Sequence, residues 1–259
     1  MDRRGLCTLS GLEYIARTRP KVIVLEQVAS ILHKTHAKVW GFVLKILAAL
    51  KYKVVFKILN TKNFAVPQSR PRVYLLGVAE EICSGKLEMP KERTKPVDLH
   101  HFLNKGCQGT EVLSLPHYEK LVGEKLWSRG FVLDVGSSER FQTVMKNITP
   151  CLTRTRLQQR GYYIPKLRRR LLGEEAARLQ GVPRKVFEAM LQAAAANALP
   201  ERTVEESLGD GMSINVLAAV LQNGLAAAKL VRQGPEYWRM VSDGQSAASL
   251  SDKLFDDQI

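Results

Sequence analysis

A single carboxylate, Glu26, stands in a position where it could act on a bound molecule. It directly follows the apolar run at 22–25, which is typical of a strand buried on both faces, as in a parallel sheet. Catalytic groups in α/β proteins gather at the carboxyl ends of strands, where a carboxyl group can give a proton or a hydrogen bond to a substrate. A carboxylate that only caps the next segment is the alternative, and the residues alone favour it.

Two arginines form a second candidate group. The segment Gln68-Ser69-Arg70-Pro71-Arg72 stands just before another apolar run. Side chains at alternate positions of an extended segment point to opposite sides, so one arginine could hold a ligand while the other braces a loop. The planar guanidinium suits this role because it makes rigid, bidentate hydrogen bonds. Two surface arginines are the alternative for so short a pattern.

A strongly basic stretch lies between residues 140 and 170. It holds nine lysines or arginines and no acid, with Phe141, Tyr162 and Tyr163 among them. Positive charge with interleaved aromatics suits contact with a phosphate backbone. The net charge of +14 also indicates a polyanionic partner, most often nucleic acid. A solvated basic loop is the alternative. The residues predicted to contact nucleic acid are Arg154, Arg156, Arg160 and Arg168.

A glycine-bounded turn, Gly209-Asp210-Gly211-Met212, precedes the last long helical pattern. Such a turn directs free main-chain N–H groups towards a ligand carboxylate. An ordinary helix N-cap at Asp210 or Ser213 explains the local sequence equally well.

Hydrophobic periodicity predicts the elements that position these residues. Helices are predicted at 5–18, 37–50, 173–180, 184–197 and 212–230, and strands at 22–25, 52–59 and 73–78. The order helix, strand, helix, strand, loop, strand is typical of the second half of an α/β layer. Between about residues 83 and 170, prolines and glycines without a clear period predict a loop-rich segment.

The remaining composition argues against several classes of protein. The four cysteines form no Cys-x-x-Cys pair, and the five histidines supply no ligand set, so no metal site is predicted. A solvated helix face explains His33 and His36. No signal peptide opens the chain, and no apolar run reaches the roughly 18 residues of a membrane helix. We therefore expect an intracellular, reduced protein that does not enter the membrane.

Four segments, in this order and spacing, resemble the later motifs of the cytosine-5 DNA methyltransferases. They are Leu25-Glu26-Gln27-Val28, Gln68 to Arg72, Glu175 to Pro183, and Gly209 to Leu217. The third resembles Arg-x-Leu-Thr-x-Arg-Glu-x-x-Arg-Leu-Gln-Gly-Phe-Pro, with departures at Gly173 and Glu174 and with Val182 in place of Phe. It is long and specific, and it weighs most in the resemblance.

The resemblance implies a role for each candidate residue. Glu26 would give a proton or hydrogen bond to ring nitrogen 3 of a flipped cytosine, and Gln27 replaces the Asn of the family. Arg72 would contact the 2-oxo group of cytosine, and Arg70 would help to shape the pocket. Asp210, Gly211 and Met212 would complete the pocket of the cofactor, S-adenosyl-L-methionine. Double-stranded DNA would be the partner.

The resemblance also implies a domain organisation. The expected fold class is α/β, a partial S-adenosylmethionine-dependent methyltransferase (Rossmann-like) sheet with a small loop-rich target-recognition region. Residues 1–82 would form the second half of the catalytic domain, 83–170 the target-recognition region, 171–232 helices that return to the catalytic domain, and 233–259 a flexible tail. The location would be the nucleus in a eukaryote, or the cytoplasm and nucleoid in a bacterium.

Two earlier motifs of the family are absent from the 259 residues: the glycine-rich cofactor loop and the Pro-Cys-Gln nucleophile. Cys151 follows a proline, but no Gln follows it and it lies far too late in the chain. Three interpretations remain open, with activity of the chain alone uncertain. The chain is a fragment of a full methyltransferase, a subunit whose complementary half is separate, or a non-catalytic DNA-binding remnant.

Overall fold

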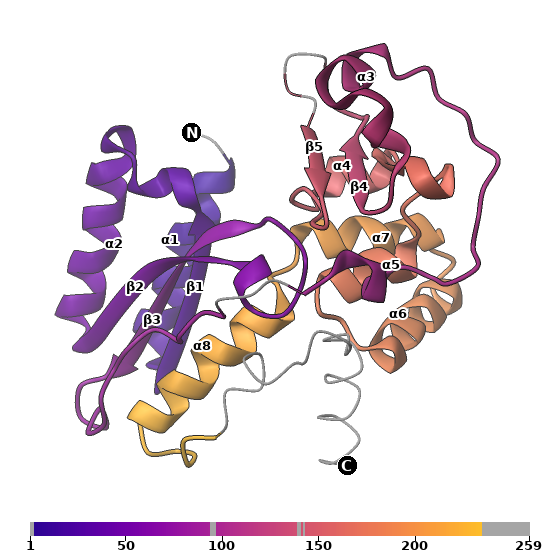
Figure 1. The fold of residues 1–259 in the computed structure, drawn as a ribbon. Helices are drawn as coiled ribbons and strands as arrows, with labels where there is room; N and C mark the ends of the chain where they lie inside the picture. The colour runs from indigo at the N-terminus through magenta and orange to yellow at the C-terminus, as the bar shows by residue number, and fades with distance from the viewer. Residues whose placement is uncertain (1–2, 94–96, 139–140, 142, 235–259) are drawn as a thin grey trace. The chain divides into compact units, whose positions relative to one another are not determined.

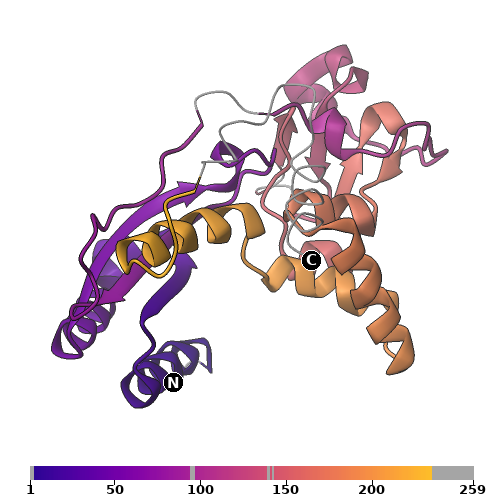
Figure 2. The same cartoon turned by 90° about the horizontal axis from the view of Figure 1, so that it is seen from below.

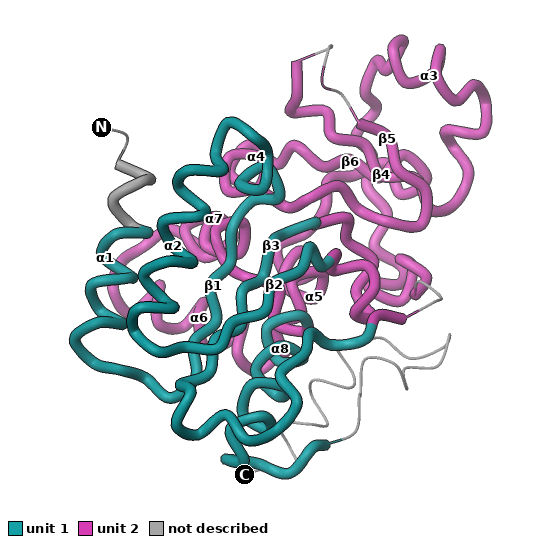
Figure 3. The backbone as a smooth tube through the Cα atoms, turned by 90° about the vertical axis from the view of Figure 1, so that its left-hand side faces the viewer, with its two compact units in different colours: residues 1–59, 71–91, 216–236 teal, residues 60–70, 92–215, 237–259 magenta. Residues whose placement is uncertain are grey.

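The computed structural model divides the chain into two compact units (Figure 3). The first unit takes residues 1–59, 71–91 and 216–236, and the second is built from residues 60–70 and 92–215. Residues 1–2, 94–96, 139–140, 142 and 235–259 are not described, so the predicted flexible tail falls almost entirely outside the described residues.

The first unit is a three-stranded sheet with helices (Figure 1). Its elements are α1 (Arg3–Thr18), β1 (Val22–Val28), α2 (Ala37–Ala49), β2 (Tyr52–Asn60), β3 (Pro71–Ala79) and α8 (Ile214–Ala227). All six were predicted from the sequence, with α8 beginning two residues later than expected. The strand order is β1-β3-β2, and β1 pairs with β3 in antiparallel register. The expectation of a parallel neighbour for β1 is therefore wrong for this pair.

The two faces of this sheet bury different side chains of β3. Val73 and Leu75 pack with α1 and α2, in a core that includes Leu12 and Trp40. The alternate residue Val78 packs with Ala227 at the end of α8. Alternation along the strand thus places α8 on the face opposite α1 and α2 (Figures 1 and 2).

Close approach between α8 and the sheet depends on Gly224. A Cβ atom at this position would lie 2.6 Å from Leu76 Cδ1 and 2.9 Å from Val22 Cγ1. A side chain there would force the helix away from the strands.

Edge strand β2 is more exposed than its alternating sequence suggests. Phe56 is 41% exposed and Ile58 is 44% exposed. Lys53 and Lys57, on the other face, are also exposed. Both faces of this strand are therefore partly exposed at residues 56–58.

The second unit contains a small antiparallel sheet followed by helices. The strands are β4 (Phe131–Asp134), β5 (Thr143–Lys146), β6 (Tyr162–Ile164) and β7 (Arg169–Arg170), in the order β5-β4-β6-β7. The helices are α3 (Pro116–Val122), α4 (Arg154–Gln158), α5 (Gly173–Leu179), α6 (Arg184–Ala196) and α7 (Glu201–Asp210). Periodicity found α5 and α6 but missed α3, α4, α7 and the four strands. The strands, of two to four residues, are too short to show a period.

Local signals define the ends of α5, α6 and α7. Glu175 Oε2 accepts the N–H of Leu172, so a carboxylate in the first turn of α5 satisfies a free donor. Gly181, with φ of 78°, ends the same helix in the left-handed conformation that glycine favours. Pro183 and Pro200 stand at the N-caps of α6 and α7.

Candidate functional site

Glu26 and Arg72 lie together on one face of the first unit's sheet. Glu26 faces Tyr74 in the β1–β3 register, and Val28 faces Arg72, so the two charged residues are diagonal neighbours. Arg72 Nε lies 3.7 Å from Glu26 Oε1, and the two side chains are only 16% and 14% exposed. The antiparallel pairing that the sequence did not predict is what brings this pair together.

The chemistry of this pair is specific. A carboxyl group accepts or donates a proton, whereas a guanidinium only donates hydrogen bonds. Side by side, they match a planar ligand edge that carries a ring nitrogen next to a carbonyl oxygen. Shielding from water strengthens both interactions.

Gln27, between Glu26 and Val28, points to the other face of β1. Its Nε2 lies 3.4 Å from Thr8 Oγ1 of α1, to which it donates. This contact joins the strand to the helix that precedes it. The Gln27 side chain therefore braces β1 against α1.

Arg70 belongs to the second unit and is buried, with 3% exposure. Its Nη1 donates to the main-chain carbonyl of Leu152 at 2.8 Å, and its Nη2 donates to that of Gly211 at 2.8 Å. Cys151 Sγ lies 3.7 Å from Nη1. Among the predicted catalytic residues, Arg70 thus holds main-chain segments, while Glu26 and Arg72 face each other.

Two buried glutamines, Gln68 and Gln180, extend this arrangement, and the sequence predicted no role for either. Gln68 Nε2 donates to Leu179 O at 2.6 Å and to Gln180 Oε1 at 2.9 Å. Gln180 Nε2 donates in turn to the carbonyls of Leu208 and Gly211. The signal for them was an amide side chain within each of two motif-bearing segments.

The turn predicted to hold the cofactor is partly engaged by the protein itself. The Asp210 carboxylate is 58% exposed and lies 3.2 Å from Arg154 Nη1. The Gly211 carbonyl accepts from Arg70 and Gln180. Within the described residues, the N–H groups of Met212 and Ser213 make no hydrogen bond, and the buried Ser213 hydroxyl has no partner. The turn therefore offers a ligand three donors, which fits the polar end of a cofactor only in part.

The basic stretch separates into paired and unpaired arginines. Arg156 Nε lies 3.0 Å from Asp134 Oδ1, and Arg154 contacts Glu206 as well as Asp210. Arg160 and Arg168 are exposed, and neither has an acidic partner within 4 Å among the residues that the structure describes.

The aromatic residues of this stretch also differ. Tyr162 and Tyr163 are buried, whereas Phe141 is 67% exposed. Tyr162 donates to Cys151 O at 2.7 Å and accepts from Thr153 N at 3.1 Å. These two tyrosines are therefore core residues rather than surface partners of the arginines.

A cavity of about 540 Å³ opens in the second unit beside these residues. Ser69, Thr153 and Thr155 line it, together with Arg156 and the Asp134 with which Arg156 pairs. Hydroxyl and guanidinium donors in one hollow suit the phosphate or sugar of a nucleic acid.

Metal and membrane sites are not found in the described part of the chain. Among these residues, no group of three or more His, Cys, Asp or Glu could hold a metal ion. No helix there has the length and apolar composition needed to cross a membrane.

The fold is shared with solved methyltransferase structures. The methyltransferase EhMeth of Entamoeba histolytica superposes over 89% of this chain and 71% of its own, with a TM-score of 0.56. At 16% identity this likeness shows the fold alone, which is the Rossmann-like α/β fold of the methyltransferases.

The sequence then defines the family. The family described as C-5 cytosine-specific DNA methylase matches residues 1–223, and this chain belongs to it. Type II methyltransferase M.MthTI of Methanothermobacter thermautotrophicus is 28% identical over 132 residues, which cover 47% of this chain and 40% of that relative. M.NgoBI of Neisseria gonorrhoeae is 35% identical over 81 residues, covering 31% and 26%. The matched region thus spans less than half of either relative. The resemblance drawn from the four motifs is confirmed at the level of the family.

Proposed function

We propose that this chain supplies the target-base pocket and the DNA-contacting region of a DNA (cytosine-5-)-methyltransferase. The observation that carries the proposal is the close pair of Glu26 and Arg72, 3.7 Å apart and largely shielded from water. Cytosine presents ring nitrogen 3 beside its 2-oxo group, which is the edge that a carboxyl and a guanidinium match.

Each residue of the pair has a separate role. Protonated Glu26 donates to ring nitrogen 3 and makes ring carbon 6 more electrophilic. Arg72 donates to the 2-oxo group and holds the base after it has left the stack. Arg70 acts as a positioning residue, because its guanidinium binds the main chain of the segments at 152 and 211.

The cofactor, S-adenosyl-L-methionine, supplies the methyl group when bound. The N–H groups of Met212 and Ser213, with the Ser213 hydroxyl, would hold its polar end; Asp210 and Gly211 shape the turn. None of the four cysteines follows the Pro-Cys-Gln pattern of the nucleophile. We therefore assign the thiolate and the main cofactor loop to a complementary half, present in cis or in a partner chain.

The second unit would hold the DNA. Arg160 and Arg168 are the strongest candidates for phosphate contacts, because neither is engaged by an acid within the described residues. Arg154 and Arg156 would contribute after exchanging their acidic partners for phosphate. We assign residues 83–170 to target recognition and 171–232 to the helices that return to the catalytic domain. The presence of most of α8 in the first unit supports this return. The protein would work in the nucleus of a eukaryote, or in the nucleoid of a bacterium.

The test is reconstitution with the complementary half, followed by steady-state kinetics with labelled cofactor. Glu26→Gln and Arg72→Ala should each lower kcat by about 10²-fold or more, the range of general acid–base groups, while changing DNA affinity little. Arg17→Gln, an exposed arginine of the same unit, is the matched control. Circular dichroism establishes that each variant is folded. Normal turnover by both folded variants would show that the pair is not the base pocket.

The exposed Arg160 and Arg168, which have no acidic partner among the described residues, also suit a second candidate, a non-catalytic DNA-binding protein. The two candidates differ in one measurement. A methyltransferase half restores methyl transfer when combined with its complement, whereas a DNA-binding remnant binds DNA but never restores transfer.

A further inference from the structure

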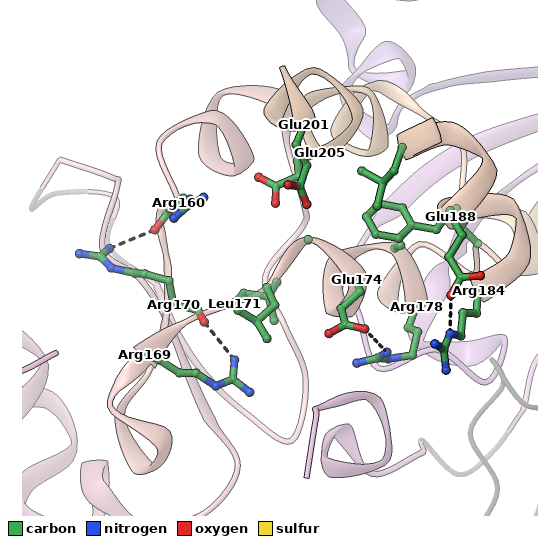
Figure 4. Close-up of a pocket in the computed structure, with 16 residues that line it drawn as sticks. Arg160, Arg169, Arg170, Leu171, Glu174, Arg178, Arg184, Glu188, Glu201 and Glu205 are labelled. Carbon is green, nitrogen blue, oxygen red and sulfur yellow. Dashed lines mark hydrogen bonds and ion pairs between the residues drawn. The ribbon is translucent and has the colours of Figure 1, made fainter. Parts of the chain in front are cut away.

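A second cavity lies within the second unit, among β7, α5, α6 and α7 (Figure 4). Its volume is about 620 Å³, within the range of small-ligand sites. It contains none of the residues assigned to the cytosine or the cofactor, and it shares only Arg160 with the predicted DNA contacts. The proposed function therefore gives it no role.

One part of this cavity is apolar. Leu171, Val182 and Phe187 line it, and each is less than 10% exposed. Leu191 of α6, half-buried, continues the same wall. Such a wall favours the apolar body of a ligand rather than water.

Four of the five arginines that line the cavity are neutralised by carboxylates. The pairs are Arg169–Glu175 at 2.7 Å, Arg170–Glu111 at 2.8 Å, Arg178–Glu174 at 3.5 Å and Arg184–Glu188 at 2.7 Å. Arg160 is the exception, with no acidic partner within 4 Å in the described part of the chain. The arginines therefore leave a single unmatched positive charge.

Two carboxylates that line the cavity have no basic partner among the described residues. Glu201 and Glu205 are four residues apart on α7 and share a helix face. Neither makes a hydrogen bond or ion pair with another described residue. Figure 4 shows both carboxylates on the side of the cavity that faces Arg160. Two acids against one arginine leave this end of the cavity one negative charge in excess.

The surroundings of Glu205 show that its charge is poorly compensated. Burial raises the pKa of Glu205, and the neighbouring Glu201 raises it further, against the opposing effect of Arg160. Gly173 makes room for the side chain, because a Cβ atom there would collide with the Glu205 carboxylate. A larger residue at 173 would displace the acid from the cavity.

We propose that this cavity binds a cation carried on an apolar stem. The cationic head, an ammonium or guanidinium, lies between Glu201 and Glu205, and the stem lies against Val182, Phe187 and Leu191. Such a head restores the charge balance of the acidic end. The stem removes apolar wall from water, at about 25 cal/mol for each Å² covered. The same chemistry is offered by a free aliphatic amine and by a lysine or arginine side chain of another protein.

The experiment uses isothermal titration calorimetry of the full chain with three probes of equal length: n-hexylamine, n-hexanol and hexanoate. Hexylamine should bind at least ten-fold more tightly than either of the others. Glu205→Gln should weaken hexylamine binding at least ten-fold. Glu206→Gln, which removes the same charge from the next residue of α7 but does not line the cavity, should leave it unchanged.

A second variant tests the same site without changing Glu205, in case Glu205→Gln loses binding because it is misfolded. Leu191→Lys, at a half-buried position of α6, introduces a competing ammonium and should abolish hexylamine binding while far-UV circular dichroism stays the same. Equal binding of hexanoate and hexylamine, or full affinity in folded Glu205→Gln, would overturn the proposal.

A final arm separates the two sources of the cation. The same titration is made with a lysine tripeptide whose ends are blocked. If the tripeptide binds more tightly than hexylamine, the cationic head belongs to a protein side chain. The reverse order assigns it to a free amine. If neither probe binds, the cavity has no cation site.

Discussion

At the residue scale, the same two charge types serve different purposes in the two units. Glu26 and Arg72 form a long ion pair in the first unit, with Arg72 Nε 3.7 Å from Glu26 Oε1. Glu175 and Arg169 form two bonds of 2.7 and 2.8 Å, and Glu175 is fully buried. Its oxygens also accept the N–H groups of Asn104 and Leu172. The tight pair is a structural link, while the long pair is suited to chemistry.

The buried pair gives a stability prediction. Arg169→Ala should lower the free energy of unfolding by about 3–5 kcal/mol, because it leaves the Glu175 carboxylate buried without its counter-charge. Glu188→Ala removes the exposed i,i+4 pair with Arg184 and should cost at most about 1 kcal/mol. Urea denaturation followed by circular dichroism measures both. Similar losses for the two variants would contradict the distinction between a structural and a surface ion pair.

At the element scale, sequence patterns predicted the first unit well and the second unit poorly. The strands of the first unit are seven to nine residues long, so their apolar runs are visible. The antiparallel β1–β3 pairing was not visible, because burial on both faces does not determine strand direction. The strands of the second unit are two to four residues long and depend on tertiary hydrogen bonds.

The candidate site, too, was predicted only in part from the sequence. The motif resemblance named Glu26, Arg70 and Arg72, and the structure brings Glu26 and Arg72 together. The main-chain contacts of Arg70 and the Gln68–Gln180 pair could not be predicted, since their partners lie 82 to 141 residues away in sequence. Likewise, the acidic partners of Arg154 and Arg156 are distant in the chain.

The contact between α7 and α4 gives an element-scale prediction. A Cβ atom on Gly209 would meet the main chain of Thr153 and Arg154, with Arg154 Cα at 2.7 Å. Main-chain atoms yield little, so Gly209→Ala should cost about 1–3 kcal/mol of unfolding free energy. Gly211→Ala is the control, because the nearest atom to its Cβ would be Ser207 O, at 3.5 Å. Thermal denaturation of the two variants compares them, and equal melting temperatures would argue against the close helix contact.

At the scale of the whole molecule, the ionisation of two buried tyrosines reports whether the second unit is folded. Burial raises the pKa of Tyr118 and of Tyr162 well above the ordinary value near 10. The folded state therefore favours the neutral phenol of each tyrosine. The free energy of unfolding keeps its full value below about pH 10 and falls as the pH rises further, because the unfolded chain then ionises its tyrosines more readily. Absorbance at 295 nm should show these two of the seven tyrosines ionising only together with unfolding. Tyr162→Phe should reduce the late step, and its persistence would contradict the assignment.

Net charge gives the second whole-molecule prediction. With 39 basic and 25 acidic residues, the chain should bind DNA with an affinity that falls steeply with salt. Converting both Arg160 and Arg168 to Glu should weaken binding to all sequences and reduce the salt slope by about 2. Arg202→Glu reverses another exposed arginine of the same unit, outside the basic stretch. Fluorescence anisotropy at several salt concentrations measures the slopes, and an equal loss for the control would indicate a general charge effect.

The position of α8 in the chain has a consequence for biosynthesis. The face of β3 that carries Leu76 and Val78 is complete by residue 79, but the helix that covers it begins at residue 214. At about 5–20 residues per second, a ribosome needs on the order of ten seconds or more to make the intervening chain. During that time the nascent sheet presents an apolar face to solvent, where chaperones and other nascent chains compete to bind it.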